Sequence, residues 1–417
     1  MELSAADARD RLELLAELGY GFVESGQTSG QTERVLRDCA RSLGLSSLGF
    51  NSFGRLLLLE TTSPDGGTVS VQGAAKALDF VDCARARKLS AVADELTDRG
   101  EQPDLADAHR RVALLRRTAT PWWARAFGMT LLAFAISMQV GVTWHAWVAA
   151  ALVQVVTSLT GLLTARWTMP SLLSAAVCSS AGGAFATLLV KIGFVDPVGA
   201  AAAIAVTWLL LLPLPQIIGA VTDAIDADHL SALTRVASVL VAGVGVFVGG
   251  AFTFALGELL DMDHPKLDHL PTFPWYAILV FSALGAIANA FANGGTLSLV
   301  GPAATLGVVT GTVNQVLLRV ADAPTLWANS ASAVVLGVLT VVLAARTGYP
   351  QPVLALMGVT GALLPGIPVF FGILQEMGEG SGAAYFGQAA TICVGIGAGV
   401  AFGAWVTERA RSRRTSR

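Results

Sequence analysis

The chain has 417 residues, of which 53% are hydrophobic and 14% are charged, and its formal net charge at pH 7 is −3. An average soluble domain has about 25% charged residues, so this composition indicates a protein that crosses a membrane several times. The near-neutral charge makes nucleic acid an unexpected partner. The composition therefore argues against a soluble globular protein and against a nucleic-acid-binding protein.

Residues 1–120 are expected to form a small cytoplasmic α+β domain, because they are rich in charge and lack an apolar run long enough to cross a bilayer. Apolar spacing predicts helices over 6–25 and 31–43, and again in the charged segments that begin at Asp79 and Pro103. Between them, LGFNSFGRLLLLETT and TVSVQG, separated by SPDGG, predict the two strands of a hairpin. The polar start of the chain lacks the pattern of a secretory signal, so no cleaved targeting segment is expected.

About ten transmembrane helices are predicted after this domain, because each apolar segment is near the roughly 20 residues that a span requires. The predicted spans are 121–141, 144–165, 168–190, 198–220, 231–257, 273–293, 296–318, 325–345, 350–374 and 384–407. Arginines precede the first span and follow the last, which places both termini in the cytoplasm. The expected parts are a first membrane repeat at 121–257, an extracytoplasmic connection at 258–272, a second membrane repeat at 273–407 and a basic cytoplasmic tail at 408–417.

The two sets of five spans look like copies of one unit. Trp122 and Trp275 are 275 − 122 = 153 residues apart, and the same offset relates several other pairs. These pairs are Thr143 and Thr296, Thr157 and Thr310, Pro197 and Pro350, Pro215 and Pro368, Gly219 and Gly372, and Asp223 and Glu376. Because five is odd, the second copy must enter the membrane from the opposite side, which makes an inverted repeat. The predicted fold class is a polytopic α-helical membrane protein with two inverted five-helix repeats.

Each repeat contains a span that its own sequence should break. LLPLPQIIGAVTDAID begins at Leu211 and LLPGIPVFFGILQEMGEG begins at Leu363. Proline removes a backbone donor and clashes with the preceding turn, so helices bend or stop there. The expected helix-breaking residues are Pro213, Pro215, Gly219, Pro365, Gly366, Pro368 and Gly372. Simple kinks would explain either segment alone, whereas a matched pair is typical of the substrate site of a secondary transporter.

Carboxylates follow both broken segments by about two turns. Asp223 and Glu376 would lie on opposite sides of the membrane, where we hypothesise that they bind a proton or a substrate ammonium group. The alternative is an ordinary solvated loop acid, which is the favoured interpretation of Asp226, Asp228 and Glu379.

Other polar candidates lie within the predicted spans. Arg235 could pair with Asp223 or with a substrate carboxylate, or it could extend its side chain to the membrane surface. Further polar side chains suit a small, hydroxylated zwitterion, namely Gln154, Thr157, Ser158, Thr310, Thr312, Asn314 and Gln315. Hydrogen bonding between helices is the alternative, and it accounts best for the serine and threonines.

Three stretches resemble the threonine/serine exporter family, and the resemblance covers nearly the whole chain. They are ESGQTSGQTERVLRDCARSLGL, LLPLPQIIGAVTDAIDADHLSALTRVASVL and LLPGIPVFFGILQEMGEG. The resemblance implies a ten-span, proton-motive-force-dependent exporter of threonine and serine in a bacterial cytoplasmic membrane. Its matching positions are Pro215, Asp223, Arg235, Pro365, Gly366 and Pro368. The chain departs from the family in having LPLP in the first half and Gln31 where an arginine is common.

Other functions remain as alternatives. A dicarboxylate exporter of the same family would need more than one cation in the core, and a membrane sensor would use residues 1–120 to bind a ligand. An enzyme is not expected, because residues 1–120 have no nucleophile elbow, HExxH motif or metal-ligand cluster. ATP-driven transport is not expected either, because the chain has no phosphate loop. No cofactor or metal is predicted, since the four scattered cysteines suit buried thiols. The expected partners are a small-molecule substrate, protons and the lipid bilayer, with a homo-oligomer left open.

Overall fold

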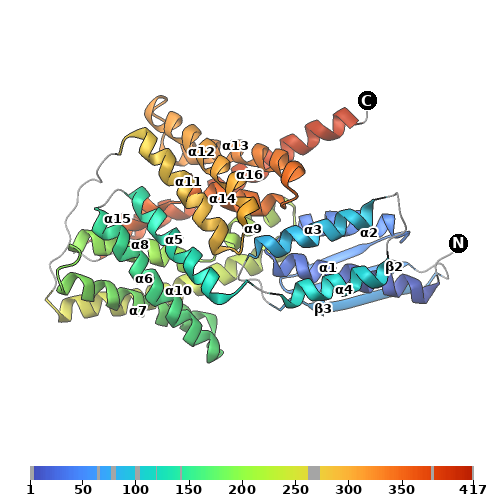
Figure 1. Cartoon of the computed structure of the whole chain (residues 1–417), viewed down its shortest axis with the longest axis horizontal. Coiled ribbons are helices and arrows are strands. Elements are labelled where there is room, and N and C mark those ends of the chain that lie inside the picture. Colours follow the sequence, from blue (N-terminus) through green and yellow to red (C-terminus); the bar gives the residue numbers. More distant parts are fainter. Residues whose placement is uncertain are drawn as a thin grey trace.

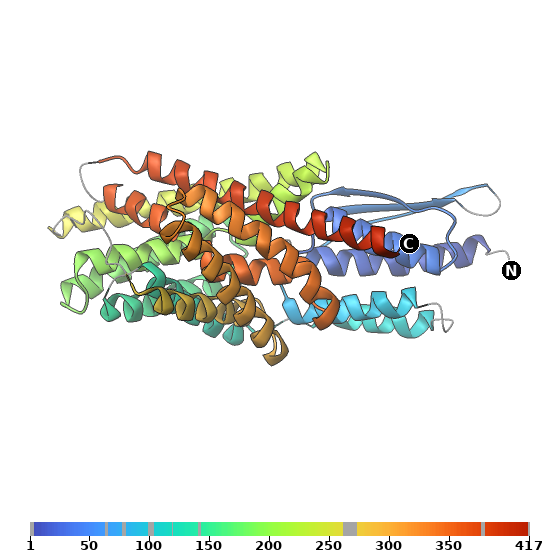
Figure 2. The same cartoon turned by 90° about the horizontal axis from the view of Figure 1, so that it is seen from above.

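The computed structural model of the chain describes residues 4–62, 66–76, 81–98, 104–118, 120–140, 143–261, 273–376 and 380–415. An N-terminal unit of helices and strands lies at one end of a long helical bundle (Figure 1). Figure 2 shows that both parts extend along the same axis and that the C-terminal helix reaches alongside the N-terminal unit. The bundle begins at Trp122, next to the predicted boundary after residue 120.

The N-terminal unit contains four helices and a three-stranded antiparallel sheet among the described residues. Its elements are α1 (Ala5–Glu24), α2 (Ser29–Ser42), β1 (Gly49–Phe53), β2 (Leu56–Thr62), β3 (Thr68–Ala74), α3 (Cys83–Thr97) and α4 (Leu105–Arg117). The strand order is β1-β2-β3, and Phe53 pairs with Leu56 across the first turn. Leu57 and Leu59 of β2 are fully buried against α1, so the unit has a hydrophobic core of its own.

The predicted hairpin is present as β2 and β3, which pair antiparallel, but its first stretch contains one more strand than predicted. The stretch LGFNSFGRLLLLETT forms two strands rather than one, because the chain reverses at Gly54. Gly54 has a φ of +64°, a conformation that glycine adopts without a steric penalty. The second predicted strand is β3, and residues 63–65 of the predicted SPDGG turn lie outside the described residues.

The bundle consists of long helices and two pairs of short ones. They are α5 (Trp122–Val140), α6 (Trp144–Arg166), α7 (Ser171–Lys191), α8 (Pro197–Leu211), α9 (Leu214–Ile225), α10 (His229–Leu259), α11 (Trp275–Ala292), α12 (Leu297–Arg319), α13 (Thr325–Thr347), α14 (Gln351–Ala362), α15 (Gly366–Glu376) and α16 (Ala383–Thr415). In the described part of the chain, eight helices are long and apolar enough to cross a membrane. The count of candidate spans in these residues rises to ten if each bent pair is taken as one span. Most of the predicted 258–272 connection, from residue 262 onward, lies outside the described residues.

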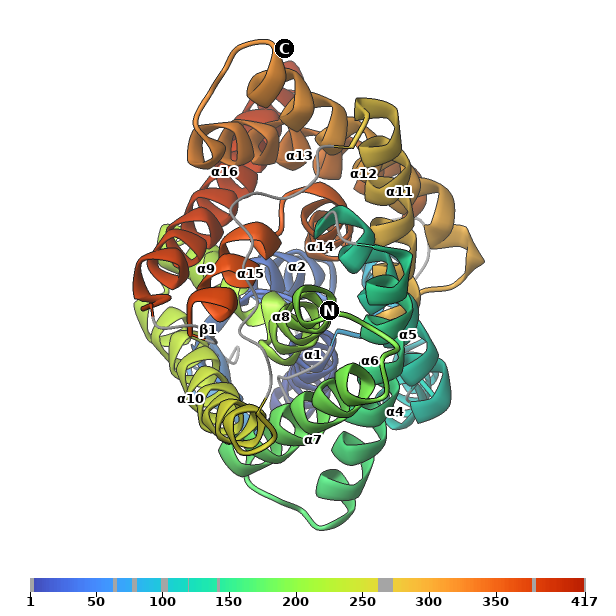
Figure 3. The same ribbon diagram turned by 90° about the vertical axis from the view of Figure 1, so that its left-hand side faces the viewer.

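Both predicted helix breaks are present. Helices α8 and α9 are bent by 50° on either side of Leu212 and Pro213, and α14 and α15 by 55° before Gly366. Figure 3 looks along the bundle and shows α8, α14 and α15 surrounded by the longer helices. All residues of 199–209 and of 353–361 are buried, so the helices that lead into both breaks lie within protein.

The second half of the bundle repeats the helix pairings of the first. The pairs α5–α6, α6–α8 and α7–α10 have counterparts in α11–α12, α12–α14 and α13–α16. Helix α5 packs on its counterpart α11. Helices α6 and α12 start and end at the same 153-residue offset. The arrangement therefore follows the offset found in the sequence.

The N-terminal unit contacts both halves of the bundle. On the second half, the backbone N–H of Cys83 at the start of α3 donates to the carbonyl of Asn293, at 2.8 Å. Arg87 donates to Oγ of Ser298, also at 2.8 Å, and its guanidinium lies over the ring of Tyr349. On the first half, the unit meets α9 and α10, where the polar cluster described next is found.

Candidate functional site

The tight turn between α9 and α10 positions the first elements of the site. Asp228 caps α10 by accepting from the backbone N–H of Ser231 at 3.0 Å, and its own N–H donates to the carbonyl of Asp223 at 2.9 Å. Ala227 between them has a φ of +63°. The turn folds α10 back against α9, so that Asp223 and Arg235 face each other.

Asp223 and Arg235 form a buried ion pair. Arg235 Nε lies 2.7 Å from Asp223 Oδ2, and the two residues are 5% and 0% exposed. The other guanidinium nitrogens donate to Oε1 of Gln216 at 2.9 Å and to the carbonyl of Gln27 at 3.0 Å. These hydrogen bonds offset the loss of water around both charges. Pairing with Asp223 is one of the roles considered for Arg235 from the sequence.

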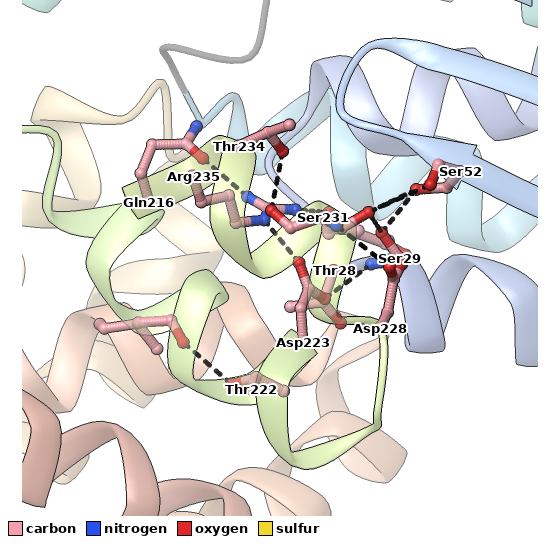
Figure 4. Close-up of polar contacts among 12 residues, drawn as sticks. Thr28, Ser29, Ser52, Gln216, Thr222, Asp223, Asp228, Ser231, Thr234 and Arg235 are labelled. Atoms are coloured by element: carbon pink, nitrogen blue, oxygen red, sulfur yellow. Dashed lines mark hydrogen bonds and ion pairs between the residues drawn. The ribbon is translucent and has the colours of Figure 1, made fainter. Parts of the chain in front are cut away.

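The N-terminal unit covers this ion pair (Figure 4). The backbone N–H of Ser29, in the first turn of α2, donates to Asp223 Oδ1 at 3.1 Å. The positive end of the α2 dipole therefore points at the carboxylate. The hydroxyls of Ser29, Ser52 and Ser231 lie within 2.7–2.9 Å of one another and join α2, β1 and α10. Ser29 and Ser52 were not predicted as site residues, because the residue that they contact on the bundle, Ser231, is 202 and 179 positions away.

A cavity of about 110 Å³ lies beside the ion pair, between the N-terminal unit and the bundle. Its walls come from the 25–28 loop and α2, one face of α9, the start of α14 and the end of α16. Arg34 and Glu408 form an ion pair of 2.8 Å at its wall, and Gln351 donates to Glu408 at 2.9 Å. Asp226 lines the cavity, whereas Asp223 is paired with Arg235 and is not among the lining residues.

Asn314 lies at the second helix break rather than at this junction. Its Nδ2 donates to Oδ1 of Asn329 at 2.6 Å, and Asn329 donates to the carbonyl of Leu363 at 3.4 Å. Asn289 similarly donates to the carbonyl of Leu356 at 3.1 Å. Asn329 therefore compensates a carbonyl at the end of α14, and Asn289 bonds a carbonyl within that helix. Asn289 and Asn329 were not singled out from the sequence, although an amide within an apolar segment was the available signal.

The remaining polar candidates do not converge on the junction. Thr157 and Thr310 donate to the carbonyls of Val153 and Leu306 in their own helices. Gln315 is half-buried on α12. Gln154 donates to Ser158 at 3.2 Å, Thr312 donates to Val308, and both bonds stay within one helix.

Glu376 ends α15 near the end of the bundle away from the N-terminal unit, whereas α9 ends beside that unit (Figure 1). Its Oε1 accepts from the backbone N–H of Gly382 at 2.7 Å. Both carboxylates accept from a backbone N–H, and among the described contacts Asp223 is also paired with a guanidinium. Glu379 lies outside the described residues.

Within the described ranges, no group of three or more His, Cys, Asp or Glu is arranged to hold a metal ion.

Gly219 and Gly372 have equivalent places in the two short helices that follow the breaks. A Cβ at Gly219 would lie 2.9 Å from Nη1 of Arg235, and a Cβ at Gly372 would lie 2.7 Å from the ring of Phe386. Each glycine therefore lets a short helix pack closely on the span that follows it, α10 or α16.

We expect Gly219→Ala to destabilise the protein by about 1–3 kcal/mol, because the added methyl group must displace a guanidinium that three hydrogen bonds hold in place. Thermal unfolding of the purified protein measures the effect. Gly257→Ala is the matched control, since nothing lies within 4 Å of a Cβ at that position of α10. Equal stability of the two variants would contradict the close packing at Gly219.

The fold and the site define a class of protein. The apolar helices, the two bent helix pairs in the core and the polar junction are those of a multi-pass membrane protein of the transporter type.

A family model described as "Putative threonine/serine exporter" matches residues 13–257 and 261–406, and the chain belongs to this family. The chain is 23% identical over 421 residues to a Mycobacterium tuberculosis (strain ATCC 25618 / H37Rv) protein named "Probable threonine/serine exporter", with 97% of this chain and 77% of that protein covered. No solved structure matches the chain.

Proposed function

We propose that the protein is a secondary active exporter of threonine and serine that couples export to protons. The observation that carries the proposal is the pair of broken spans, α8–α9 and α14–α15, buried in the core of a member of this family. Broken helices expose backbone carbonyls and N–H groups to a polar solute in the middle of a bilayer. The name of the M. tuberculosis relative agrees with this substrate class.

Two inverted five-helix repeats are part of the proposal. The repeated helix pairings and the equivalent glycines after both breaks support it. Inverted repeats suit alternating access, because two halves of opposite orientation can exchange an inward-open and an outward-open arrangement. The membrane is the cytoplasmic membrane of a bacterium, with both termini in the cytoplasm as the arginine distribution predicts.

The positions of Asp223 and Glu376 support different roles for the two carboxylates in transport. Asp223 closes the end of the bundle that faces the N-terminal unit, and Glu376 lies near the other end. In the proposed cycle, the N-terminal unit seals the cytoplasmic side when Ser29 caps Asp223, and it separates from α9 and α10 when the solute enters. A carboxylate at each end can take up and release a proton during the exchange.

A dicarboxylate exporter is the alternative within the same family. A doubly anionic solute needs cationic groups that are not already compensated. Arg235 is paired with Asp223, and Arg34 is the one cation among the described residues that line the cavity. One cation beside two anions suits a zwitterion better than a dicarboxylate at the junction. The family assignment also favours transport over catalysis.

Counterflow of labelled threonine in proteoliposomes, with and without a pH gradient, tests the proposed function. We expect gradient-dependent flux in the wild type and at least a tenfold loss in Asp223→Asn and in Glu376→Gln. Arg9→Gln is the control, because Arg9 is exposed and pairs only with Glu13 four residues away among the described contacts. Movement of succinate in place of threonine would support the dicarboxylate alternative, and movement of neither solute would refute the proposal.

A further inference from the structure

The cavity at the junction has an excess of negative charge. The charged residues that line it in the described part of the chain are Arg34, Asp226 and Glu408, one cation and two anions. The pKa of Asp226 is higher than its ordinary value, mainly because the carboxyl group is buried. The charge of Arg34 lowers this pKa, and the charge of Glu408 raises it. A ligand that brings a positive group to this wall would therefore be attracted.

One buried acceptor in the cavity wall has no partner. Oε1 of Gln31, in the first turn of α2, is buried and receives no hydrogen bond among the described residues. A buried amide oxygen that is left unpaired is unfavourable, and a donor from a ligand would satisfy it.

Asp226 packs against the residue that precedes Gln31, and both Gln31 and Asp226 line the cavity. A Cβ on Gly30, the residue before Gln31, would lie 2.5 Å from Oδ2 of Asp226, so the carboxylate packs directly on the first turn of α2. The acceptor comes from the N-terminal unit and the carboxylate from the end of α9. The two acceptors therefore come together only when the N-terminal unit packs on α9.

We propose that this cavity binds the transported amino acid, with its ammonium group held by Gln31 Oε1 and Asp226 and its carboxylate directed to Arg34. The apolar residues Ile218, Val353 and Leu356 of the same cavity cover the aliphatic part of the solute. The N-terminal unit is then a component of the binding site and supplies two of its three polar contacts. This inference rests on the proposed function and adds the location and the chemistry of the site.

Equilibrium binding of tritiated threonine to the purified full chain in detergent tests the proposal. We expect Gln31→Leu and Asp226→Asn each to raise the Kd at least tenfold, whereas Gln31→Glu, which keeps an acceptor, retains binding. Arg41→Gln is the control on the same helix, because Arg41 is exposed and does not line the cavity. Competition by 3-hydroxybutyrate, which lacks the ammonium group, should be absent.

The role of Arg34 has a separate readout. Threoninol keeps the ammonium group but lacks the carboxylate, so wild-type protein should bind it more weakly than threonine, and Arg34→Gln should bind the two equally.

The outcomes distinguish the site from the function. If Gln31→Leu and Asp226→Asn bind and transport threonine with wild-type Kd and KM, the proposed site is wrong and the exporter assignment stands. If the wild type neither binds nor moves threonine, the proposed function itself fails.

Discussion

Oxidation of a Ser52→Cys/Ser231→Cys variant should slow threonine flux at least tenfold, and a reducing agent should restore it. The two hydroxyl oxygens are 2.7 Å apart, so cysteines at these positions can form a disulfide between β1 and α10 with little movement. The bond would hold the N-terminal unit on the ion pair of Asp223 and Arg235. If the N-terminal unit must separate from α10 for the solute to enter, the disulfide prevents this separation and transport stops.

The experiment uses reconstituted protein in which Cys393, the half-buried native cysteine, is replaced by alanine; the other three are buried. Ser47→Cys/Thr62→Cys is the control, because these hydroxyls are 3.3 Å apart within the N-terminal unit and a bond there leaves the junction free. Recovery on reduction shows that the variant is folded. Undiminished flux in fully cross-linked protein would mean that the junction stays closed throughout transport.

Breaking the buried ion pair should have the largest effect on stability. Asp223→Asn leaves the Arg235 guanidinium buried without its counter-charge, and removal of one partner of such a pair costs about 3–5 kcal/mol. Arg235→Gln leaves Asp223 buried with the Ser29 N–H as its remaining described partner. The double variant should lose less than the sum of the two single losses, because it leaves neither charge unpaired.

Thermal unfolding of the four proteins in one detergent measures this coupling. Arg9→Gln is again the comparison, since it breaks a pair whose side chains are 68% and 47% exposed and should change stability by less than about 1 kcal/mol. Additive losses in the double variant would show that Asp223 and Arg235 do not stabilise each other.

Local sequence chemistry was sufficient to predict the helix breaks. Pro213 and Pro365 lie between the short helices of each bent pair, where proline cannot continue the hydrogen bonding of the preceding turn. The repeat offset was readable because prolines and glycines recur at fixed places in an otherwise uniform apolar sequence. Gly219 and Gly372 illustrate this, since each has a close neighbour that excludes a larger residue.

The junction could not be predicted in the same way. Ser29 and Ser52 are ordinary polar residues in their local context, and their partner Ser231 is determined by the docking of two regions far apart in the chain. The third strand was missed because Gly54 marks a turn inside a stretch with continuous strand-forming residues. A carboxylate after a helix break and a cation within an apolar span singled out Asp223 and Arg235, but neither signal indicated that the N-terminal unit covers them.

The contacts of the N-terminal unit with both halves of the bundle also affect the order in which the protein folds and assembles. Synthesis makes this unit before any span, yet its contacts include Asn293, Ser298 and Glu408, which are made much later. The unit must therefore fold on its own core while the membrane helices are still being inserted. The contacts with both halves are complete only when α16 has been made, so formation of the Arg34–Glu408 ion pair would report finished assembly.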